Sequence, residues 1–532
     1  MTVAVYPIVS GDYERGGDAS KQLKTLLKKI GADPAAVRRT MIAAYEAEMN
    51  VVIHARDGAM RVAVDPEQVE VAVVDEGPGI PDIDRALTEG FSTAPAEARE
   101  LGFGAGMGLP NIRKNSDRFT IHSELGRGTQ IRFAVRLQPA QTCGTQPNSV
   151  SLDISRCRQC LRCLGACPTQ AARVYCGRPE VLEHLCVDCT ACAEACPADV
   201  FGFPAQAIPP DISPETVLVL PVSLLGQLGP GVRPGDVLEA LASLGFHDVR
   251  VGTIWEDALD EAVRAYAAAT AFPVLPPVCP AVVNLIRMRF PSLLPHIPPF
   301  LTPIEAAREA ITGPHVVAVV PCPAQYTAFA GPNGLTRVDI VAPGALLQAL
   351  LPRLKRHGRD AAAGALLKGE AAVRVGGMGA VTRFLEEVEN GQAADCASVA
   401  LYACPDGCFG APVWRTHPAL ARQRAREALP RQQAPGVAVR RVRPLTPRAG
   451  LRLDADMRRA MRKLGEIDAL TRQLPGRDCG VCGAPTCGAL AEDIVRGRAT
   501  IEACTFRETR RAGDARRESP HEAEEHSRNT GS

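Results

Sequence analysis

The alternation of apolar and polar positions predicts a compact first domain over residues 1–138. A helical apolar pattern begins after Asp33, a capping residue followed by proline, and continues to about Ala55. Two strand-like runs follow, MRVAV and VEVAVVDEG. A later pair, within RFTIHSELGRGTQIRFAVRL, predicts a hairpin that turns at residues 126–128.

A second pattern occupies residues 214–425, where strand-like runs alternate with helical ones. The runs are TVLVLPVSL, VLEALASLGF, VRVGTIW and EDALDEAVRAYAAA. Such alternation favours an α/β layer with parallel strands. Residues 450–508 predict a small helical module, and residues 509–532, whose only apolar residues are alanines, predict a disordered tail. The fold class expected is multidomain, α+β and α/β.

Composition narrows the function classes. The 532 residues carry a formal net charge of +1, which gives no electrostatic footprint for nucleic acid or an acidic membrane. The chain shows neither an apolar run of eighteen residues nor a signal peptide, so we expect a cytoplasmic protein with no membrane partner. Nineteen cysteines in such a protein indicate metal or redox chemistry, because cytosolic disulfides are rare.

Two cysteine runs, CRQCLRCLGACP and CVDCTACAEACP, lie between residues 157 and 197. Each is C-x-x-C-x-x-C-x-x-x-C-P, the spacing that ligates cuboidal iron–sulfur clusters. Residues 150–205 resemble a bacterial ferredoxin with two 4Fe–4S clusters. In that family the fourth cysteine of each run serves the other cluster. The resemblance therefore implies two ligand sets: Cys157, Cys160, Cys163 with Cys196, and Cys186, Cys189, Cys192 with Cys167. Structural zinc is the weaker alternative.

Four pieces of the first domain occur in a fixed order: E-x-x-x-N on the helix, D-x-G-x-G after a strand, a G-x-G-x-G-x-G segment, and G-x-G-T in the hairpin. Together they resemble the ATP-binding domain shared by histidine kinases, gyrase, a heat-shock chaperone and the anti-sigma-factor serine kinases. The resemblance covers residues 10–137, is closest to the anti-sigma kinases, and implies an α/β sandwich fold for this domain.

That resemblance implies roles for residues of this domain. Asn50 would bind Mg²⁺, and Glu46 would be the catalytic base. Asp75 would accept the adenine amino group, and Thr129 would reach the adenine through water. The glycines would let the backbone approach the nucleotide or form its lid. They are Gly77, Gly79, Gly102, Gly104, Gly106 and Gly108.

Four further cysteines follow or interrupt apolar runs of the second pattern: Cys279, Cys322, Cys404 and Cys408. Their surroundings, VCPAVVNLIRMRFPSLLPHI, VPCPAQ and ACPDGC, resemble the C-terminal domain of the iron-only hydrogenase large subunit over about 215–420. In that family the four cysteines hold a 4Fe–4S cube. Val278 stands where the family has a proton-relaying cysteine, and Gln325 where it has a lysine for an anionic ligand. We therefore expect a retained cube and no hydrogen turnover.

The C-terminal module contains a fourth cysteine set. Its cysteines are Cys479, Cys482, Cys487 and Cys504. C-x-x-C followed by a third and a distant fourth cysteine resembles the small iron–sulfur domain of electron-transfer complexes and corrinoid proteins. We expect a fourth 4Fe–4S cluster there, with zinc as the alternative.

These elements predict a redox- or hydrogen-sensing regulatory protein whose clusters and inactive hydrogenase-like domain control an ATP-binding domain. Electrons would come from a ferredoxin or a hydrogenase, and the ATP domain would act on a regulatory protein. One alternative is an electron-transfer subunit that uses ATP to reduce a partner, and another is an active hydrogenase. Two further questions stay open at this point. One is whether the ATP domain phosphorylates a partner or only binds nucleotide, and the other is whether the protein forms a homodimer, as anti-sigma kinases often do.

Overall fold

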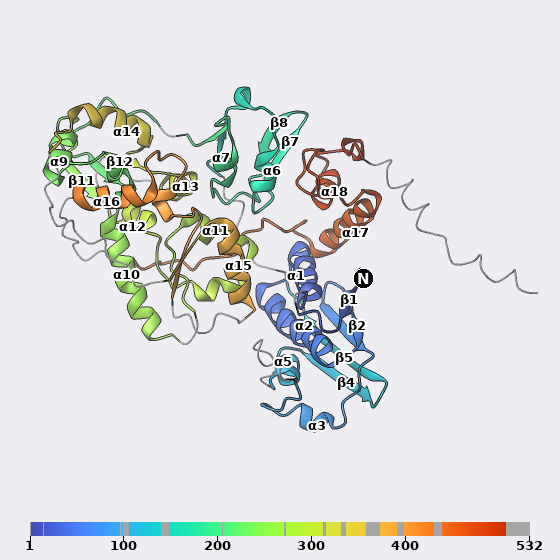
Figure 1. Cartoon of the computed structure of the whole chain (residues 1–532). Coiled ribbons are helices and arrows are strands. Elements are labelled where there is room, and N and C mark those ends of the chain that lie inside the picture. The colour runs from blue at the N-terminus through green and yellow to red at the C-terminus, as the bar shows by residue number, and fades with distance from the viewer. Residues whose placement is uncertain are drawn as a thin grey trace, which may run out of the picture.

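The structure is a computed structural model in which several α/β units pack side by side (Figure 1). The residues it describes are 2–13, 15–95, 98, 106–139, 148–204, 206–270, 273–311, 315–330, 337–357, 373–390, 398–429 and 439–506. The predicted tail, 509–532, lies outside the described residues. The mixed, multidomain α/β fold class is confirmed.

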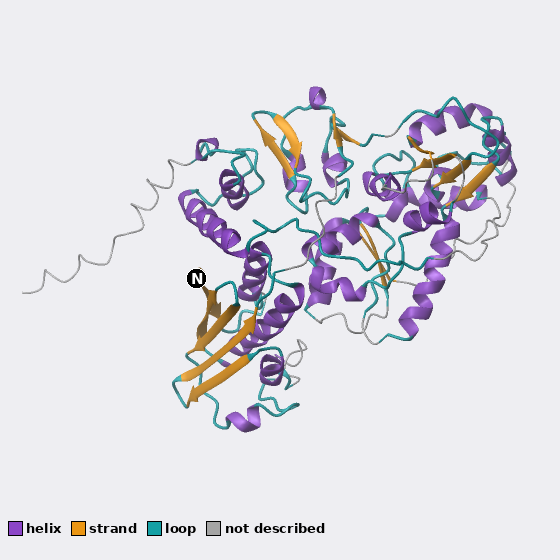
Figure 2. Cartoon of the chain, turned by 180° about the vertical axis from the view of Figure 1, so that it is seen from behind, coloured by secondary structure: helices purple, strands orange, loops and turns teal. Residues whose placement is uncertain are grey.

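The N-terminal unit is an antiparallel sheet covered on one face by helices, as Figure 2 shows from behind. Its strands, in spatial order, are β1 (Thr2–Val9), β2 (Asp57–Val64), β3 (Gln68–Asp75), β5 (Gly128–Arg136) and β4 (Arg118–Glu124). Its helices are α1 (Asp18–Ile30), α2 (Pro34–His54), α3 (Ile83–Ala86) and α5 (Gly108–Lys114). The predicted cap is present: the Asp33 carboxylate accepts hydrogen bonds from the N–H groups of Ala35 and Ala36.

The two cysteine runs form a small unit with an internal repeat. Its strands pair as two short antiparallel ladders, β6 (Ser151–Leu152) with β9 (Phe201–Gly202) and β7 (Ala172–Tyr175) with β8 (Arg178–Val181). Its helices are η1 (Ile154–Arg156), α6 (Arg162–Ala166) and α7 (Ala191–Ala195). Because α6 and α7 follow the cysteine loops and contact each other, the two loops lie close together.

The hydrogenase-like unit is built on a parallel sheet, as the alternating pattern predicts. Its strands, in spatial order, are β11 (Asp248–Val251), β10 (Val217–Leu220), β12 (His315–Val319) and β13 (Arg337–Val341), and β14 (Val373–Gly376) pairs separately with β15 (Val399–Tyr402). Its helices are α8 (Val222–Leu225), α9 (Pro234–Ala242), α10 (Thr253–Ala268), α11 (Pro280–Arg289), η2 (Pro291–His296), α12 (Pro303–Ala310), α13 (Pro323–Ala330), α14 (Pro343–Leu350), η3 (Leu351–Arg353), α15 (Met378–Glu389), η4 (Gly407–Gly410) and α16 (Pro418–Ala428). The predicted strand VRVGTIW is shorter than expected, because Ile254 and Trp255 are buried on the first turn of α10.

The C-terminal module does not stand apart from the N-terminal unit. It consists of α17 (Met457–Gln473), α18 (Cys487–Val495) and η5 (Ile501–Ala503). Met461 and Leu464 of α17 belong to the same hydrophobic core as Leu23 and Leu27 of α1. The first and last parts of the chain are therefore joined by buried apolar contacts.

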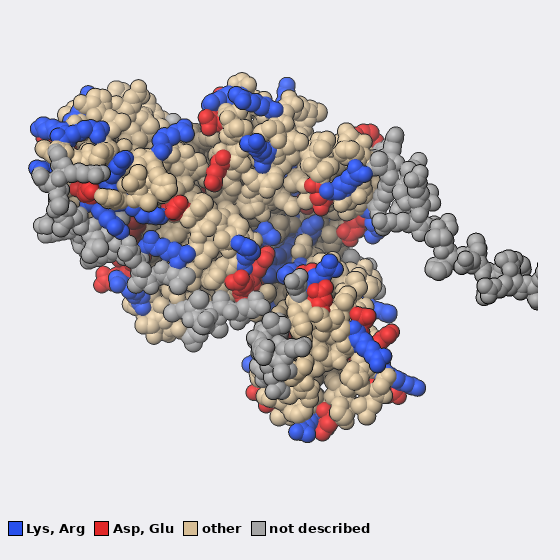
Figure 3. Space-filling view, in the orientation of Figure 1, with Lys and Arg blue, Asp and Glu red and all other residues tan. Residues whose placement is uncertain are grey.

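The surface agrees with the near-neutral charge. On the face drawn in Figure 3, basic and acidic side chains are interspersed. Within the described part of the chain, no helix is both long and apolar enough to cross a membrane.

Candidate nucleotide site and cysteine cavities

The first candidate site lies where α2 faces the start of α5. Glu46 and Asn50 occupy adjacent turns of α2. A Cβ atom built on Gly108 would lie 3.3 Å from Asn50 Oδ1 and 3.4 Å from Glu46 Oε2, so a glycine here avoids crowding both groups. Asn111 Nδ2 donates to Glu46 Oε1 at 2.7 Å, a contact that no sequence motif had indicated. Burial raises the pKa of Glu46, in the direction that suits a general base.

Asp75 ends β3 and lies beside the turn that follows it. Asp75 Oδ1 accepts hydrogen bonds from the N–H groups of Gly77 at 2.8 Å and Thr129 at 3.1 Å. Burial raises the pKa of Asp75, while these two hydrogen bonds act in the opposite direction. The structure therefore brings together three of the residues that the resemblance connects with adenine.

The glycines of this site differ in what the backbone requires of them. Gly79 has φ +78°, and a Cβ there would lie 2.4 Å from the carbonyl oxygen of Glu124, so only glycine fits. Gly106 precedes α5 by two residues, and its carbonyl accepts the N–H of Gly90 at 3.0 Å. Gly102 and Gly104 lie outside the described residues.

The first ferredoxin-type set lines one cavity of about 360 Å³, here called the outer cavity. Its four cysteines are Cys157, Cys160, Cys163 and Cys196. The loop is strained in a repeated way: Gln159 and Leu161 have positive φ, as do Asp188 and Thr190 at the matching positions of the second run. Such conformations persist only where surrounding structure imposes them, so both runs are shaped alike around their thiols.

The second ferredoxin-type set, Cys167, Cys186, Cys189 and Cys192, is also brought together. The thiol of Cys192 lies close enough to those of Cys167 and Cys186 for their charges to affect its pKa. Burial is the main cause that raises the pKa of the Cys192 thiol to about 12. Metal ligation at these thiols would therefore have to displace protons.

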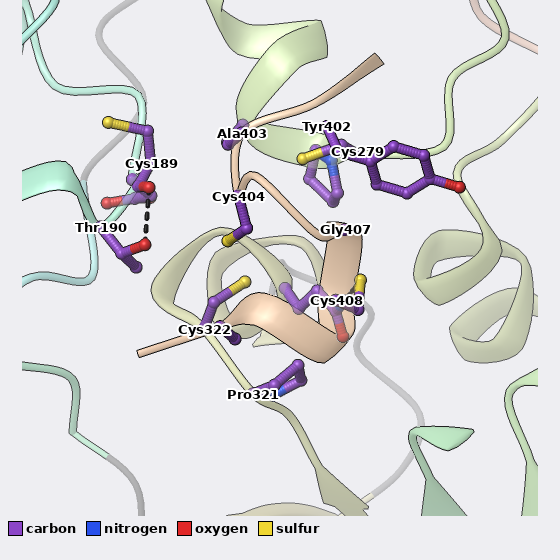
Figure 4. Close-up of a pocket in the computed structure, with 15 residues that line it drawn as sticks. Cys189, Thr190, Cys279, Pro321, Cys322, Tyr402, Ala403, Cys404, Gly407 and Cys408 are labelled. Atoms are coloured by element: carbon purple, nitrogen blue, oxygen red, sulfur yellow. Dashed lines mark hydrogen bonds between the residues drawn. The ribbon is translucent and has the colours of Figure 1, made fainter. Parts of the chain in front are cut away.

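The hydrogenase-like set lines a cavity of about 410 Å³, here called the inner cavity (Figure 4). Its cysteines come from distant segments: Cys279 precedes α11, Cys322 precedes α13, and Cys404 and Cys408 follow β15. Their sulfur atoms surround one space, whereas the sulfur of Cys189 points away from it. A donor set of four cysteines fits an iron–sulfur cluster, which would supply electron storage at this place.

The two departures from the hydrogenase pattern can be located in the structure. Val278 packs against the apolar cluster of Leu259, Val263 and Val274, so no polar group at this position can carry a proton. Gln325 lines the inner cavity, and its Nε2 atom donates to the Cys408 sulfur at 3.5 Å.

The ferredoxin-like unit contributes to the inner cavity, which the cysteine spacing alone did not indicate. Thr190 lines the cavity, and its hydroxyl donates to the carbonyl of Cys189 at 2.6 Å (Figure 4). Asp188, 4% exposed, accepts a hydrogen bond from Thr327 of α13 at 2.8 Å. The second cysteine run is thus fixed directly against the wall of the inner cavity.

The C-terminal set, Cys479, Cys482, Cys487 and Cys504, lines a cavity of about 310 Å³. A buried ion pair between Arg173 of β7 and Asp493 of α18 joins this module to the ferredoxin-like unit. The N–H of Val174 donates to the carbonyl of Gly483 at 2.9 Å beside it. Across the described ranges, no group of three or more His, Cys, Asp or Glu side chains is arranged to hold a single metal ion. The metal that each cysteine set binds stays a prediction.

Family models match three stretches of the chain. Residues 37–139 match the histidine kinase-, DNA gyrase B- and HSP90-like ATPase. Residues 216–343 match the iron only hydrogenase large subunit, C-terminal domain, and residues 474–506 match a family described as a putative Fe-S cluster. These matches confirm the three corresponding resemblances.

Curated relatives match shorter parts of the chain. The serine/threonine-protein kinase RsbT of Bacillus subtilis is 29% identical over 119 residues, which are 21% of this chain and 84% of that protein. The anti-sigma F factor of Pasteuria penetrans is 34% identical over 103 residues, 18% of this chain and 65% of that protein. A component of the ion-translocating oxidoreductase complex of Rhodobacter capsulatus is 44% identical over 39 residues, 7% of this chain and 21% of that protein. The chain spans less than two thirds of the last two relatives.

Solved structures show weaker similarity. An FeFe-hydrogenase from Chlamydomonas reinhardtii is 14% identical with a TM-score of 0.31, covering 43% of this chain and 89% of that chain. A mycobacterial sensor histidine kinase is 18% identical with a TM-score of 0.17, covering 26% of this chain and 99% of that chain. By its family matches, the chain combines an ATPase segment of the histidine-kinase type, a hydrogenase-like segment and an iron–sulfur segment.

Proposed function

We propose that this protein is a redox-responsive regulator in which cysteine-held iron–sulfur centres control an ATP-binding domain of the anti-sigma-kinase type. The partner of that domain is a regulatory protein, which the domain phosphorylates on serine, with Glu46 as base and Asn50 as a ligand of Mg²⁺. The similarity to a serine/threonine-protein kinase and to anti-sigma factors supports this partner class.

One observation carries the proposal: the ATP-binding domain and the C-terminal cysteine module share a hydrophobic core. Leu27 and Ile30 of α1 are completely buried in it, together with Leu464 and Ile467 of α17 at 4% and 2% exposure. The helices in a packed core of this kind adopt a few discrete arrangements and do not shift continuously from one to another. A change of charge at a nearby centre can therefore favour one arrangement and alter the ATP site.

Hydrogen turnover is absent from the proposed function. Val278 offers no proton relay, and the neutral amide of Gln325 lacks the charge of a lysine for an anionic ligand. Anaerobically purified protein is expected to show no hydrogen uptake with a dye acceptor, and no carbonyl or cyanide bands in the infrared. Either signal would contradict this part of the proposal.

The test of regulation is the ATP affinity of the full chain with its centres oxidised and then reduced. The proposal predicts a difference of about fivefold or more, the usual lower range of coupling between two sites. Equal affinities would instead favour the second candidate, an electron carrier. The hydrogen bond from Thr327 of α13 to Asp188 supports that candidate, because it fixes the ferredoxin-like unit against the inner cavity, which Asp188 helps to line.

A further inference from the structure

Helix α1 touches the hydrogenase-like unit through two lysines. Lys24 forms an ion pair with Glu389 at the end of α15, and Lys28 Nζ lies 3.8 Å from the other oxygen of the same carboxylate. The three side chains are only 12%, 11% and 6% exposed. Both ammonium groups also lie over the ring of Phe290, at 5.8 and 5.3 Å from its centre. Desolvated contacts of this kind hold two elements in a defined relation.

Lys28 also reaches the helix that begins at the inner cavity. Its ammonium donates to the backbone carbonyl of Arg289, the last residue of α11. The partial negative charge at a helix C-terminus favours such a cation. Cys279 is the N-cap of the same ten-residue helix. A rigid element about 15 Å long therefore runs from an inner-cavity cysteine to Lys28.

The opposite end of α1 is fixed to the helix of the ATP site. Glu48 of α2 is 2% exposed, and its carboxylate accepts hydrogen bonds from the N–H groups of Gly17 and Ala19, both at 3.0 Å. It also accepts from the N–H and the hydroxyl of Ser20. Gly17, the N-cap of α1, has no side chain to satisfy these donors, so Glu48 replaces the cap.

Glu48 lies midway between Glu46 and Asn50 on α2. A displacement of α1 that keeps these four hydrogen bonds must therefore move the part of α2 that carries the candidate base and the candidate Mg²⁺ ligand. Breaking these hydrogen bonds instead would leave a buried carboxylate without its partners, which would cost considerable free energy.

We propose that α1 couples the inner cavity to the ATP site, with Lys28 as its contact to α11 and Glu48 as its contact to α2. The inference rests on the proposed function and names the route by which the two sites affect each other. Because coupling between sites is reciprocal, nucleotide at α2 must alter α11 just as the inner cavity alters α2.

The test follows hydrogen–deuterium exchange in the full chain at one fixed oxidation state, with and without a non-hydrolysable ATP analogue and Mg²⁺. We expect the analogue to change exchange at the C-terminal turn of α11, residues 286–290, by about fivefold or more. In Lys28→Met the change falls below about twofold, with iron content and saturation by the analogue unchanged. Lys355→Met is the matched control, because it removes an exposed ion pair with Glu239 in the unit that contains α11. This variant should keep the wild-type change in exchange at α11.

Glu389→Gln provides a second variant should Lys28→Met fail to fold, since it removes the charge while its amide oxygen can accept from Lys24 and its NH2 group can donate to Ser292 Oγ. The same loss of response is expected from it. The route through α1 would be wrong if the ATP analogue left hydrogen exchange at α11 of the wild type unchanged. It would also be wrong if both variants kept the full change in exchange. A nucleotide response at α11 combined with equal ATP affinity in both oxidation states would leave the route intact and refute redox regulation instead.

Discussion

The outer and inner cavities each contain one predicted set of four cysteine ligands, yet they are built in opposite ways. The outer cavity is formed within one short unit by loops on the surface, and Cys160 is exposed. The four predicted ligands of the inner cavity come from three separate segments, and its walls, such as Ala281 and Ala411, are buried at 2% and 4% exposure. Burial raises the pKa of Cys404 to about 12 and that of Cys322 still further.

This difference in burial suits the two cavities to different roles. A centre near the surface can exchange electrons with a partner, and its charge is screened by water. An electron added at the inner cavity acts in a medium of lower dielectric constant, where its field on neighbouring groups is stronger. Under the proposed function, a redox change at the inner cavity would therefore affect packing more strongly than one at the outer cavity.

Removal of iron should give the largest difference between the unit that forms the outer cavity and the hydrogenase-like unit. We expect the chelated protein to lose amide protection across β7 and β8, because metal-binding energy, on the order of 10 kcal/mol, is folding energy in small metal-dependent units. The sheet of β10–β13 should keep its protection, since Leu218 and Val317 at its centre are fully buried in an extensive apolar core. Equal loss of protection in both units, measured by hydrogen exchange, would remove the distinction.

The next effect concerns the attachment of the outer cavity to the C-terminal module. Asp493→Ala leaves Arg173, 2% exposed, without its buried partner and should lower the free energy of unfolding by about 3–5 kcal/mol. The control Glu124→Ala removes an exposed ion pair with Arg127 and should cost less than about 1 kcal/mol. Urea unfolding of the iron-loaded protein measures both. A loss below about 1 kcal/mol for Asp493→Ala would indicate that the two units are independent.

A smaller effect is expected from pH at the end of α11 that lies away from the inner cavity. Burial is the main cause that lowers the pKa of Lys28 to about 7; among its neighbours Glu389 and Glu386 raise it, while Lys24 and Arg289 lower it. The unfolded lysine keeps a pKa of about 10.4 and binds more protons between pH 7 and 10. The contribution of Lys28 to stability therefore increases with pH across this window, by at most about 1.4 kcal/mol per unit.

The difference in unfolding free energy between wild type and Lys28→Met, followed from pH 6 to pH 9, isolates that contribution. We expect the unfolding free energy of the wild type to increase relative to that of Lys28→Met as the pH rises above 7. A difference that stays constant would show that Lys28 keeps its proton throughout.

The smallest effect concerns Gln325, which belongs to the inner cavity alone. Hydrogen bonds to cysteine sulfur raise the reduction potential of iron–sulfur centres. Gln325→Leu removes the bond to Cys408 and should lower one potential by about 20–40 mV, the equivalent of a weak hydrogen bond at 59 mV per tenfold change. Electron paramagnetic resonance during a redox titration would measure this shift. A shift at every centre would contradict the separation of the cavities.

The sequence could predict what is local along the chain. The spacing of each cysteine run predicts its own three-thiol loop, and the D-x-G-x-G motif predicts that Gly77, two residues after Asp75, lies beside that carboxylate. The place of Cys196 in the outer set was implied by the resemblance to ferredoxins. The contacts of Asp188 with Thr327, of Glu48 with the start of α1, and of Lys28 with α11 join residues far apart in the chain. No periodicity encodes such pairs, because they depend on how finished units pack. The cysteines of the inner cavity were predictable only through their family resemblance.

The most direct test of the central claim is the reduction potential of the inner-cavity centre with and without ATP. Reciprocity between the two sites predicts that saturating ATP and Mg²⁺ shift one potential by at least about 40 mV, the equivalent of a fivefold change in affinity. The shift should disappear in Cys322→Ala, which removes a predicted ligand of the inner cavity, and persist in Cys160→Ala, which alters the outer cavity. Potentials that are the same with and without ATP would contradict the account.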